Sequence, residues 1–222
     1  LLGARHVPAG LVRRVQEKAE GNPLFVEEIT TSLREGGLVR QSNGGVVWAS
    51  DAVVEFPGTV QDIIRARLDR LDDPVKRTVQ TAAVIGRQFG LNLLRRVSER
   101  SQEVQQYVES LKRLELVHET RFFPELEYIF KHAVIQDVAY QSLLGQRRKE
   151  LHGAIARAIE DLYADRLENQ APILAYHYAR SAHGDQAIKY AFLAGDRAAR
   201  LYAHTEATSY YEQALVTARA LP

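Results

Sequence analysis

The sequence predicts a mainly α fold with two short β elements. Over most of the 222 residues, apolar side chains recur about every three or four positions, which is the period of an amphipathic helix. The period changes to two only in short stretches that contain Gly, Asn or Pro. We expect three domains, over residues 1–72, 73–131 and 132–222.

The first domain is expected to begin with two helices. A helix over residues 10–20 should stop at Gly21, because glycine readily takes the left-handed conformation that ends helices. Pro23 suits the first turn of the next helix, where its missing N–H costs nothing. That second helix should end at Gly36-Gly37.

A hairpin and a third helix complete this domain. Residues 38–48 surround Asn43-Gly44, a pair typical of tight β-hairpin turns. Thr59 is placed to cap the third helix, and Asp62 stands at the capping-box position. The apolar stripe of this helix is expected to be Val60, Ile63, Ile64, Leu68 and Leu71.

The second domain is expected to hold three helices and a β-ribbon. The helices should cover residues 73–85, 91–98 and 101–114, and the strands residues 116–122 and 126–130. Gly86 and Gly90 bracket a turn, Ser101 caps the third helix, and Pro124 turns the ribbon. Three helices followed by a small ribbon form the outline of a winged helix.

The third domain is expected to be helical throughout. Its helices should cover residues 132–144, 146–165, 169–182, 185–201 and 204–220. The buried stripe of the second helix should be Leu151, Ile155, Ile159 and Leu162. The last pair of helices has the spacing of a tetratricopeptide (TPR) repeat, with small or aromatic contact residues Gly195, Ala207, Tyr211 and Ala214. We expect one TPR-like hairpin, the first of an array that continues beyond Pro222.

Composition excludes several classes of function. The net charge of +1 favours neither nucleic acid nor an anionic membrane, and the absence of Cys excludes disulfides and thiolate metal sites. No apolar run is long enough to span a bilayer, so we expect a cytoplasmic protein without membrane contact. The chain starts at Leu1 and contains no Met, which we expect of a piece of a longer protein.

The sequence lacks the motifs of the common catalytic and nucleotide-binding loops. GxxxxGK[ST], GxSxG and HExxH are absent, and no GxGxxG stands at a strand–helix junction, so we expect no catalytic residue here. The seven His residues are scattered, and the pattern of His177 and His183 is too weak to predict a metal site. The acid pairs Glu27-Glu28 and Asp72-Asp73 should be solvated charges on helix faces or ends.

Two short segments have a more specific pattern than the rest of the sequence. In AEGNPLFVEEI (residues 19–29), Gly21 and Pro23 form a helix break, which by itself explains both residues. In YIFKHAVIQDVAY (residues 128–140), His132 stands where a strand passes into a helix. The N–H groups and dipole at a helix start suit a phosphate, and a His there adds a donor. The alternative is that His132 only caps or packs the helix.

Together these segments resemble a known family. GNPLFVEE, PGTVQDIIRARLDRL, AAVIGRQF, YIFKHAVIQDVAYQSLL and RRKELHGAIARAIE follow one another over most of the chain. In this order they resemble the bacterial STAND signalling ATPases, whose AAA-like module often follows class III adenylate or guanylate cyclase domains or precedes TPR arrays. The resemblance implies a helical lid over residues 1–72, then a winged helix, then the start of a TPR array.

The resemblance also implies roles for three residues. GNPL is similar to the GxP motif of such ATPases, whose lid proline packs on adenine, so Pro23, with Gly21 beside it, would bind nucleotide. KHAVIQDVA resembles their MHD segment, whose His reaches the β-phosphate of ADP, so His132 would sense that phosphate. The match is partial, because Ala133 stands where the motif has Asp. The implied cofactor is ATP or ADP, bound in the full-length protein and not by this chain alone. The implied partners are an upstream nucleotide-binding domain, an output domain of the same chain and proteins bound by the TPR-like helices.

Two other functions are open from the sequence. Winged helices often bind DNA, but the expected recognition helix over residues 101–114 carries Glu103 and Glu109 against Lys112 and Arg113. The sequence therefore disfavours nucleic acid as a partner. The other function is a scaffold for protein–protein interactions, in which the lid and winged helix have no nucleotide role.

Overall fold

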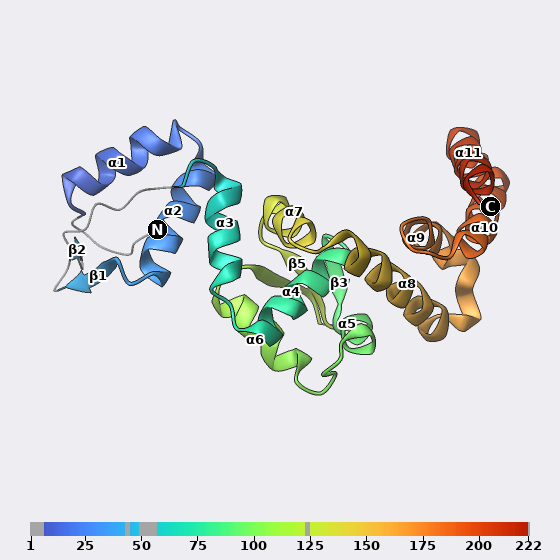
Figure 1. Ribbon diagram of the computed structural model, residues 1–222, viewed down its shortest axis with the longest axis horizontal. Coiled ribbons are helices and arrows are strands. Elements are labelled where there is room, and N and C mark those ends of the chain that lie inside the picture. Colours follow the sequence, from blue (N-terminus) through green and yellow to red (C-terminus); the bar gives the residue numbers. More distant parts are fainter. Residues whose placement is uncertain (1–6, 43–44, 49–56, 123–124, 222) are drawn as a thin grey trace. The chain divides into compact units, whose positions relative to one another are not determined.

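The structure, a computed structural model, describes residues 7–42, 45–48, 57–122 and 125–221. Helices account for most of it, which confirms the predicted mainly α class. The chain divides into two units, Leu1–Leu71 and Asp72–Pro222, and each is described by itself (Figure 1). The boundary expected between residues 131 and 132 lies inside the second unit.

The first unit combines helices with a β-hairpin. Its elements are α1 (Ala9–Ala19), α2 (Pro23–Glu35), β1 (Val39–Ser42), β2 (Gly45–Trp48) and α3 (Val60–Asp69). β1 and β2 pair antiparallel, with Ser42 opposite Gly45, so the hairpin is confirmed, although Asn43-Gly44 lies outside the described residues. Thr59 caps α3 as expected, because its Oγ1 accepts from the Asp62 amide at 3.1 Å and donates to the Asp62 carboxylate at 2.7 Å.

A buried ion-pair cluster joins α2 to α3. The expectation that Glu28 is solvated is wrong, because only 2% of this residue is exposed. Arg67 on α3 donates through Nη1 to Glu28 at 2.5 Å, and through Nε and Nη2 to the two oxygens of Glu35 at 2.9 and 2.7 Å. The packing of α2 on α3 thus places one guanidinium between two carboxylates. In the predicted α3 stripe, Leu71 is half-buried and the other four residues are buried.

The first half of the second unit has the element order of a winged helix. Its elements are α4 (Asp73–Ile85), β3 (Gln88–Gly90), α5 (Leu91–Val97), α6 (Val104–Arg113), β4 (Val117–Arg121) and β5 (Glu127–Phe130). The sheet is antiparallel, in the order β3-β5-β4. The segment before Gly90, expected to be a turn, is in fact largely strand β3 paired with β5. Phe89 stabilises this strand, since it is buried with its ring centroid 5.8 Å from Tyr128 and 5.7 Å from Phe130.

The second half of the second unit is a succession of helices. They are α7 (Ala133–Gln141), α8 (Gly145–Leu162), the short 3₁₀ helix η1 (Ala164–Arg166), α9 (Leu167–Ala179), α10 (Gly184–Arg200) and α11 (His204–Ala220). α7 and α8 pack on the first half of this unit through α4 and α5, and α9, α10 and α11 each pack on the α-helix before them (Figure 1). Glu160 on α8 ties α9 and α10 to it, because its carboxylate oxygens accept from Tyr178 and Tyr190 at 2.5 Å each. None of the helices that the structure describes has the length and apolar character needed to cross a lipid bilayer.

Two smaller predictions for this unit are wrong. Ser101 does not cap the third helix, because α6 begins only at Val104 and its N-cap residue, Glu103, makes no side-chain capping bond. Leu162 is 38% exposed, because it is the last residue of α8, where the helix ends. Pro124, expected to turn the β-ribbon, lies outside the described residues.

The α10–α11 hairpin packs closely where its sequence has small residues. Ala207 and Ala214 are buried. A Cβ added to Gly195 would lie 2.6 Å from Cε1 of Tyr211, which is far too close. The contacts predicted from the spacing of these four residues are confirmed, whereas membership of a TPR array stays a prediction.

Gly195→Ala is expected to destabilise the second unit by about 1–3 kcal/mol, the usual cost of overpacking a close contact. Gly145→Ala is the matched control, because nothing lies within 4 Å of the Cβ it would add at the start of α8. The control should be neutral or slightly stabilising. Urea unfolding followed by far-UV circular dichroism measures both. A Gly195→Ala protein as stable as the wild type would mean that the Tyr211 ring moves aside without cost.

Candidate functional site

The predicted lid residues lie in the turn between α1 and α2. α1 ends with Glu20 at φ 48° and Gly21 at φ 81°, both in the left-handed region. The Glu20 amide donates to the Gln16 carbonyl at 3.1 Å, and the Asn22 amide donates to the Ala19 carbonyl at 2.8 Å. Gly21 therefore takes the left-handed conformation expected of a residue that follows a helix.

Asn22 closes the start of α2. Its side-chain oxygen accepts from the amides of Leu24 at 3.1 Å and Phe25 at 3.4 Å. Pro23 has no amide hydrogen, so few N–H groups are left at this helix start to attract a phosphate. Gly21 and Pro23 are both exposed. The turn thus offers an approaching molecule an apolar ring in a fixed position.

His132 stands at the junction of β5 and α7. It is the N-cap residue of α7 with extended backbone, at φ −129° and ψ 145°, and its imidazole makes no capping bond. The side chain is half-buried. Its backbone is held on both sides, because its carbonyl accepts from Ile135 at 3.1 Å and the neighbouring Lys131 amide donates to Leu116 at 3.0 Å.

α7 itself places no negative charge beside His132 at the start of the helix. No acidic side chain lies in the first turn of α7, and Ala133 is exposed. Gln136 anchors the helix by donating to the Ala83 carbonyl at 3.1 Å. The structure thus brings Gly21 and Pro23 together in one turn of the first unit, whereas His132 belongs to the second unit.

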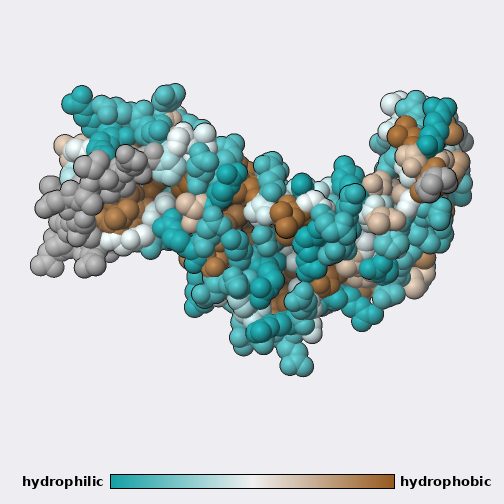
Figure 2. All heavy atoms as spheres, in the orientation of Figure 1, coloured by the Kyte–Doolittle hydropathy of each residue, from teal (hydrophilic) through white to brown (hydrophobic). Residues whose placement is uncertain are grey.

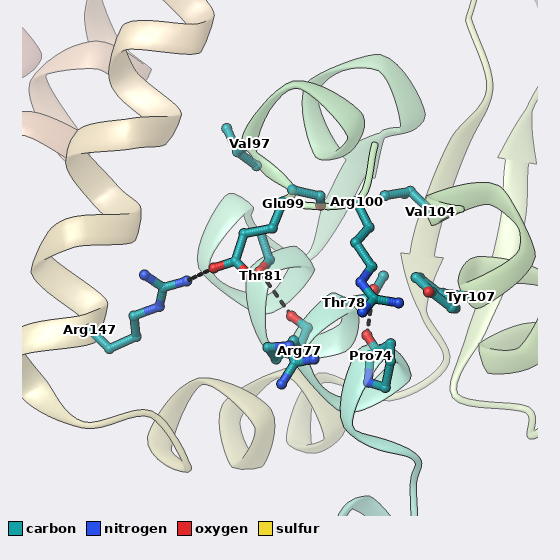
Figure 3. A pocket seen from close by; sticks show the side chains of 11 residues that line it. Pro74, Arg77, Thr78, Thr81, Val97, Glu99, Arg100, Val104, Tyr107 and Arg147 are labelled. Atoms are coloured by element: carbon teal, nitrogen blue, oxygen red, sulfur yellow. Dashed lines mark hydrogen bonds and ion pairs between the residues drawn. The ribbon is translucent and has the colours of Figure 1, made fainter. Parts of the chain in front are cut away.

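A small pocket of about 50 Å³ lies among α4, α6, α8 and the segment after α5 (Figure 3). Its three arginines are each paired with an acid: Arg77 with Asp73 at 4.0 Å, Arg100 with Glu103 at 3.5 Å and Arg147 with Glu99 at 3.2 Å. The hydroxyls of Thr78 and Thr81 bond to backbone carbonyls of α4. A space of this size holds only a few waters. Because its charges are balanced within the protein, we assign it no ligand.

A buried pair of histidines joins α8 to α9. The Nδ1 atoms of His152 and His177 are 2.9 Å apart, and the Tyr140 hydroxyl is 3.1 Å from Nε2 of His152. Burial, with the charges of Arg180 and Arg148, lowers the pKa of His152 to about 4. Burial, with His152 and Arg180, lowers the pKa of His177 to about 3. Both rings are therefore neutral at neutral pH, and one Nδ1 donates to the other.

Sequence reasoning misses this pair, because 25 positions separate its members and only the packing of α8 on α9 joins them. The one available signal is the place of His152 beside Leu151, in the predicted buried stripe. His183 takes no part in the pair, and its Nε2 lies 3.1 Å from Nη1 of Arg157. Over the described ranges, no group of three His, Asp or Glu side chains is arranged to hold a metal ion.

Of the two cations at the end of the expected recognition helix, α6, one is already paired with acids. Lys112 is bonded to Glu109 at 3.2 Å and also to Glu119 on β4. Arg113 donates to the hydroxyl of Ser110 at 3.0 Å. Because two carboxylates already neutralise Lys112, this helix is poorly suited to DNA phosphates.

The beginning of the chain matches a known protein family. Residues 1–46 match a family described as a domain of unknown function (DUF8739), and the matched segment includes Gly21 and Pro23. A search of the curated proteins finds no match. The family match covers 46 of the 222 residues and supplies no activity.

Proposed function

We propose that this chain is the regulatory segment of a nucleotide-switched signal-transduction ATPase. In this proposal an upstream nucleotide-binding domain holds ADP or ATP, and residues 1–72 act as its lid. The winged helix, residues 73–131, closes on the same nucleotide. The helices after it relay the closed or open state to an output domain such as a nucleotide cyclase. This chain performs no catalytic step itself.

The observation that carries the proposal is the exposed proline at the start of α2. Asn22 already binds two amides there, so Pro23 presents an apolar ring suited to the flat face of an adenine. His132 adds support, because an imidazole at a helix start without acids in its first turn suits a phosphate. The adenine of ADP suits the contact at Pro23, and its β-phosphate suits the contact at His132.

The switch follows from the difference between ADP and ATP. ADP held by both contacts would favour the closed state by the free energy of those contacts. Exchange for ATP would displace His132 from the β-phosphate and release the winged helix, as in other switches biased by one phosphate. A hydrogen bond to a charged group contributes about 1.5–3 kcal/mol. Its loss changes the ratio of closed to open molecules by roughly 10- to 160-fold.

Pro23→Ala is expected to weaken ADP binding by the full-length protein by about tenfold. The change removes about two ring methylenes, each contributing about 0.8 kcal/mol when buried on the base. Isothermal titration calorimetry measures it on the protein with its nucleotide-binding domain. Pro8→Ala is the control, because Pro8 also lies at a helix start of the first unit. It is the N-cap residue of α1, and its carbonyl accepts from the Leu11 amide at 2.9 Å. Equal losses in both proteins would indicate a damaged lid and not a lost base contact.

A second function, a scaffold for protein–protein interactions, is favoured by exposed apolar side chains on the last two helices. Phe192, Leu215 and Val216 are 47%, 53% and 67% exposed. On the face drawn in Figure 2, hydrophobic residues lie among hydrophilic ones over these helices. Such side chains suit further helices of an array or a protein partner. Unchanged ADP affinity in both Pro23→Ala and His132→Ala proteins would favour the scaffold over the switch.

A further inference from the structure

An open groove of about 760 Å³ lies in the second unit. Its walls come from the turn before β3 and from α7, α9 and α11, which are far apart in the sequence. Its polar and aromatic lining includes Arg87, Gln136, Tyr176, His177, Arg180 and Gln213. The groove is therefore assembled by the fold, and no contiguous motif in the sequence marks it.

The groove is positively charged. Arg87 and Arg180 line it, and none of the described residues in its walls is acidic. The Arg180 guanidinium lies 3.8 Å above the ring centre of Tyr176 and donates to the Tyr176 carbonyl at 3.2 Å. Within the described part of the chain, neither arginine forms an ion pair, in contrast to the three paired arginines of the pocket in Figure 3. Two guanidinium groups without a carboxylate attract an oxyanion.

Two buried nitrogen atoms of the groove residues have no partner. Nη1 of Arg87 and Nε2 of His177 are buried, and neither finds a hydrogen-bond partner among the described residues. His177 as a whole is fully buried. An unpaired buried polar group costs about 1–3 kcal/mol, so proteins rarely keep one without a role. Both residues line the groove, and a ligand there satisfies these two atoms once the neighbouring groups that cover them shift.

The hydrogen bonds from Tyr140 through His152 determine which ring nitrogen of His177 carries the hydrogen. If the Tyr140 hydroxyl donates to Nε2 of His152, then Nδ1 of His152 donates to Nδ1 of His177. His177 then carries its hydrogen on Nε2 and acts as a donor there. The reverse order would make Nε2 an acceptor. An oxyanion in the groove stabilises the first arrangement, which makes Nε2 a donor like Nη1 of Arg87.

Much of the remaining lining, apart from Gln136 and Gln213, is apolar or aromatic. Pro172, Ile173 and Tyr176 on α9 belong to it, and Ile173 and Tyr176 are 37% and 43% exposed. Tyr210 on α11 adds a second phenol ring. A few polar groups set in an apolar wall are the usual composition of a small-molecule site.

We propose that this groove binds a small molecule that carries a carboxylate or phosphate on an apolar or aromatic body. The oxyanion accepts from Arg87, Arg180 and His177, and the body lies on the side chains of Ile173 and Tyr176. The groove lies wholly in the second unit, so this binding does not depend on the proposed nucleotide switch.

The test is a titration of the ¹⁵N-labelled 222-residue chain with phenyl phosphate, benzoate and benzyl alcohol, followed by NMR. The three probes share an aromatic ring, so the neutral alcohol isolates the contribution of the oxyanion. Comparison of the two anions distinguishes a phosphate from a carboxylate ligand. We expect at least one anion to shift the His177 ring nitrogens and the Gly86 amide saturably, and to bind at least about tenfold more tightly than benzyl alcohol.

Variants connect those shifts to the groove. Arg87→Gln and Arg180→Gln should each weaken binding of the anion by about tenfold, and Arg180 is exposed, so its replacement does not threaten the fold. Arg77→Gln on α4 is the control, since Arg77 lines the small pocket and not the groove. The proposal is overturned by the absence of saturable shifts with both anions, by equal affinity for benzyl alcohol, or by an equal loss in Arg77→Gln.

Discussion

Lowering the pH from about 7.5 to about 5 is expected to destabilise the second unit by roughly 4 kcal/mol. The cause is the buried pair His152 and His177, whose pKa values are lowered to about 4 and about 3 in the folded protein. In the unfolded chain both imidazoles titrate near their ordinary pKa of about 6.5. Below that value the histidines become protonated in the unfolded state, whereas in the folded state they stay neutral until the pH approaches about 4. Stability is therefore complete above about pH 6.5 and falls as the pH drops towards the folded pKa values.

Each histidine contributes a slope of about 1.4 kcal/mol per pH unit within this window. Urea unfolding at several pH values, followed by far-UV circular dichroism, measures the slope. His177→Gln should reduce it to about half, because the amide keeps a polar partner for His152 and does not titrate. His118→Gln is the control, since His118 is exposed on β4. A wild-type stability that is flat between about pH 7.5 and 5, or an unchanged slope in His177→Gln, would contradict this role of the pair.

Arg67→Met is expected to destabilise the first unit by about 3–5 kcal/mol, because it leaves the carboxylate of Glu28 buried without a counter-charge. Arg67 and Glu28 are 4% and 2% exposed. Burial lowers the pKa of Arg67, but the hydrogen bonds and charges of Glu35 and Glu28 outweigh that effect and raise it overall. The guanidinium therefore stays charged in its buried position. Hydrogen exchange of the α2 and α3 amides, followed by NMR, measures the stability of this unit separately.

Two matched variants decide whether the loss comes from the unpaired charge. Arg65→Met removes an exposed cation from the same helix and should leave stability nearly unchanged. Glu28→Met combined with Arg67→Met removes both charges, and it should recover most of the loss because apolar groups of similar size tolerate burial. A double variant as unstable as Arg67→Met alone would show that packing around Arg67, and not charge pairing, holds α2 on α3.

The features that the sequence predicts well are local ones. The cap at Thr59 and Asp62 and the left-handed turn at Gly21 depend on neighbours within a few positions, so residue types alone identify them. The Gly195–Tyr211 contact was also predictable, because two helices joined by a short turn must bring those positions together. Of the candidate site, the helix break at Pro23 and the strand-to-helix junction at His132 lie where the sequence puts them. The roles of these residues towards a nucleotide are proposals.

The features that sequence reasoning misses depend on contacts between distant residues. Glu28 and Arg67 are 39 positions apart, and a charged residue is assigned to the surface unless its partner is known. β3 is only three residues long, and its pairing with β5 gives no periodic signal. The groove of the second unit combines residues of segments far apart in the sequence, so its chemistry becomes visible only in the folded unit.

The ADP affinity of the full-length protein, with and without the His132 imidazole, tests the nucleotide switch most directly. His132→Ala should weaken ADP binding by about tenfold or more, which is at least about 1.4 kcal/mol. His118→Ala, at an exposed position of β4, should leave it unchanged. Circular dichroism of each variant would verify an intact fold. Unchanged ADP affinity in a folded His132→Ala protein would contradict the proposed phosphate contact.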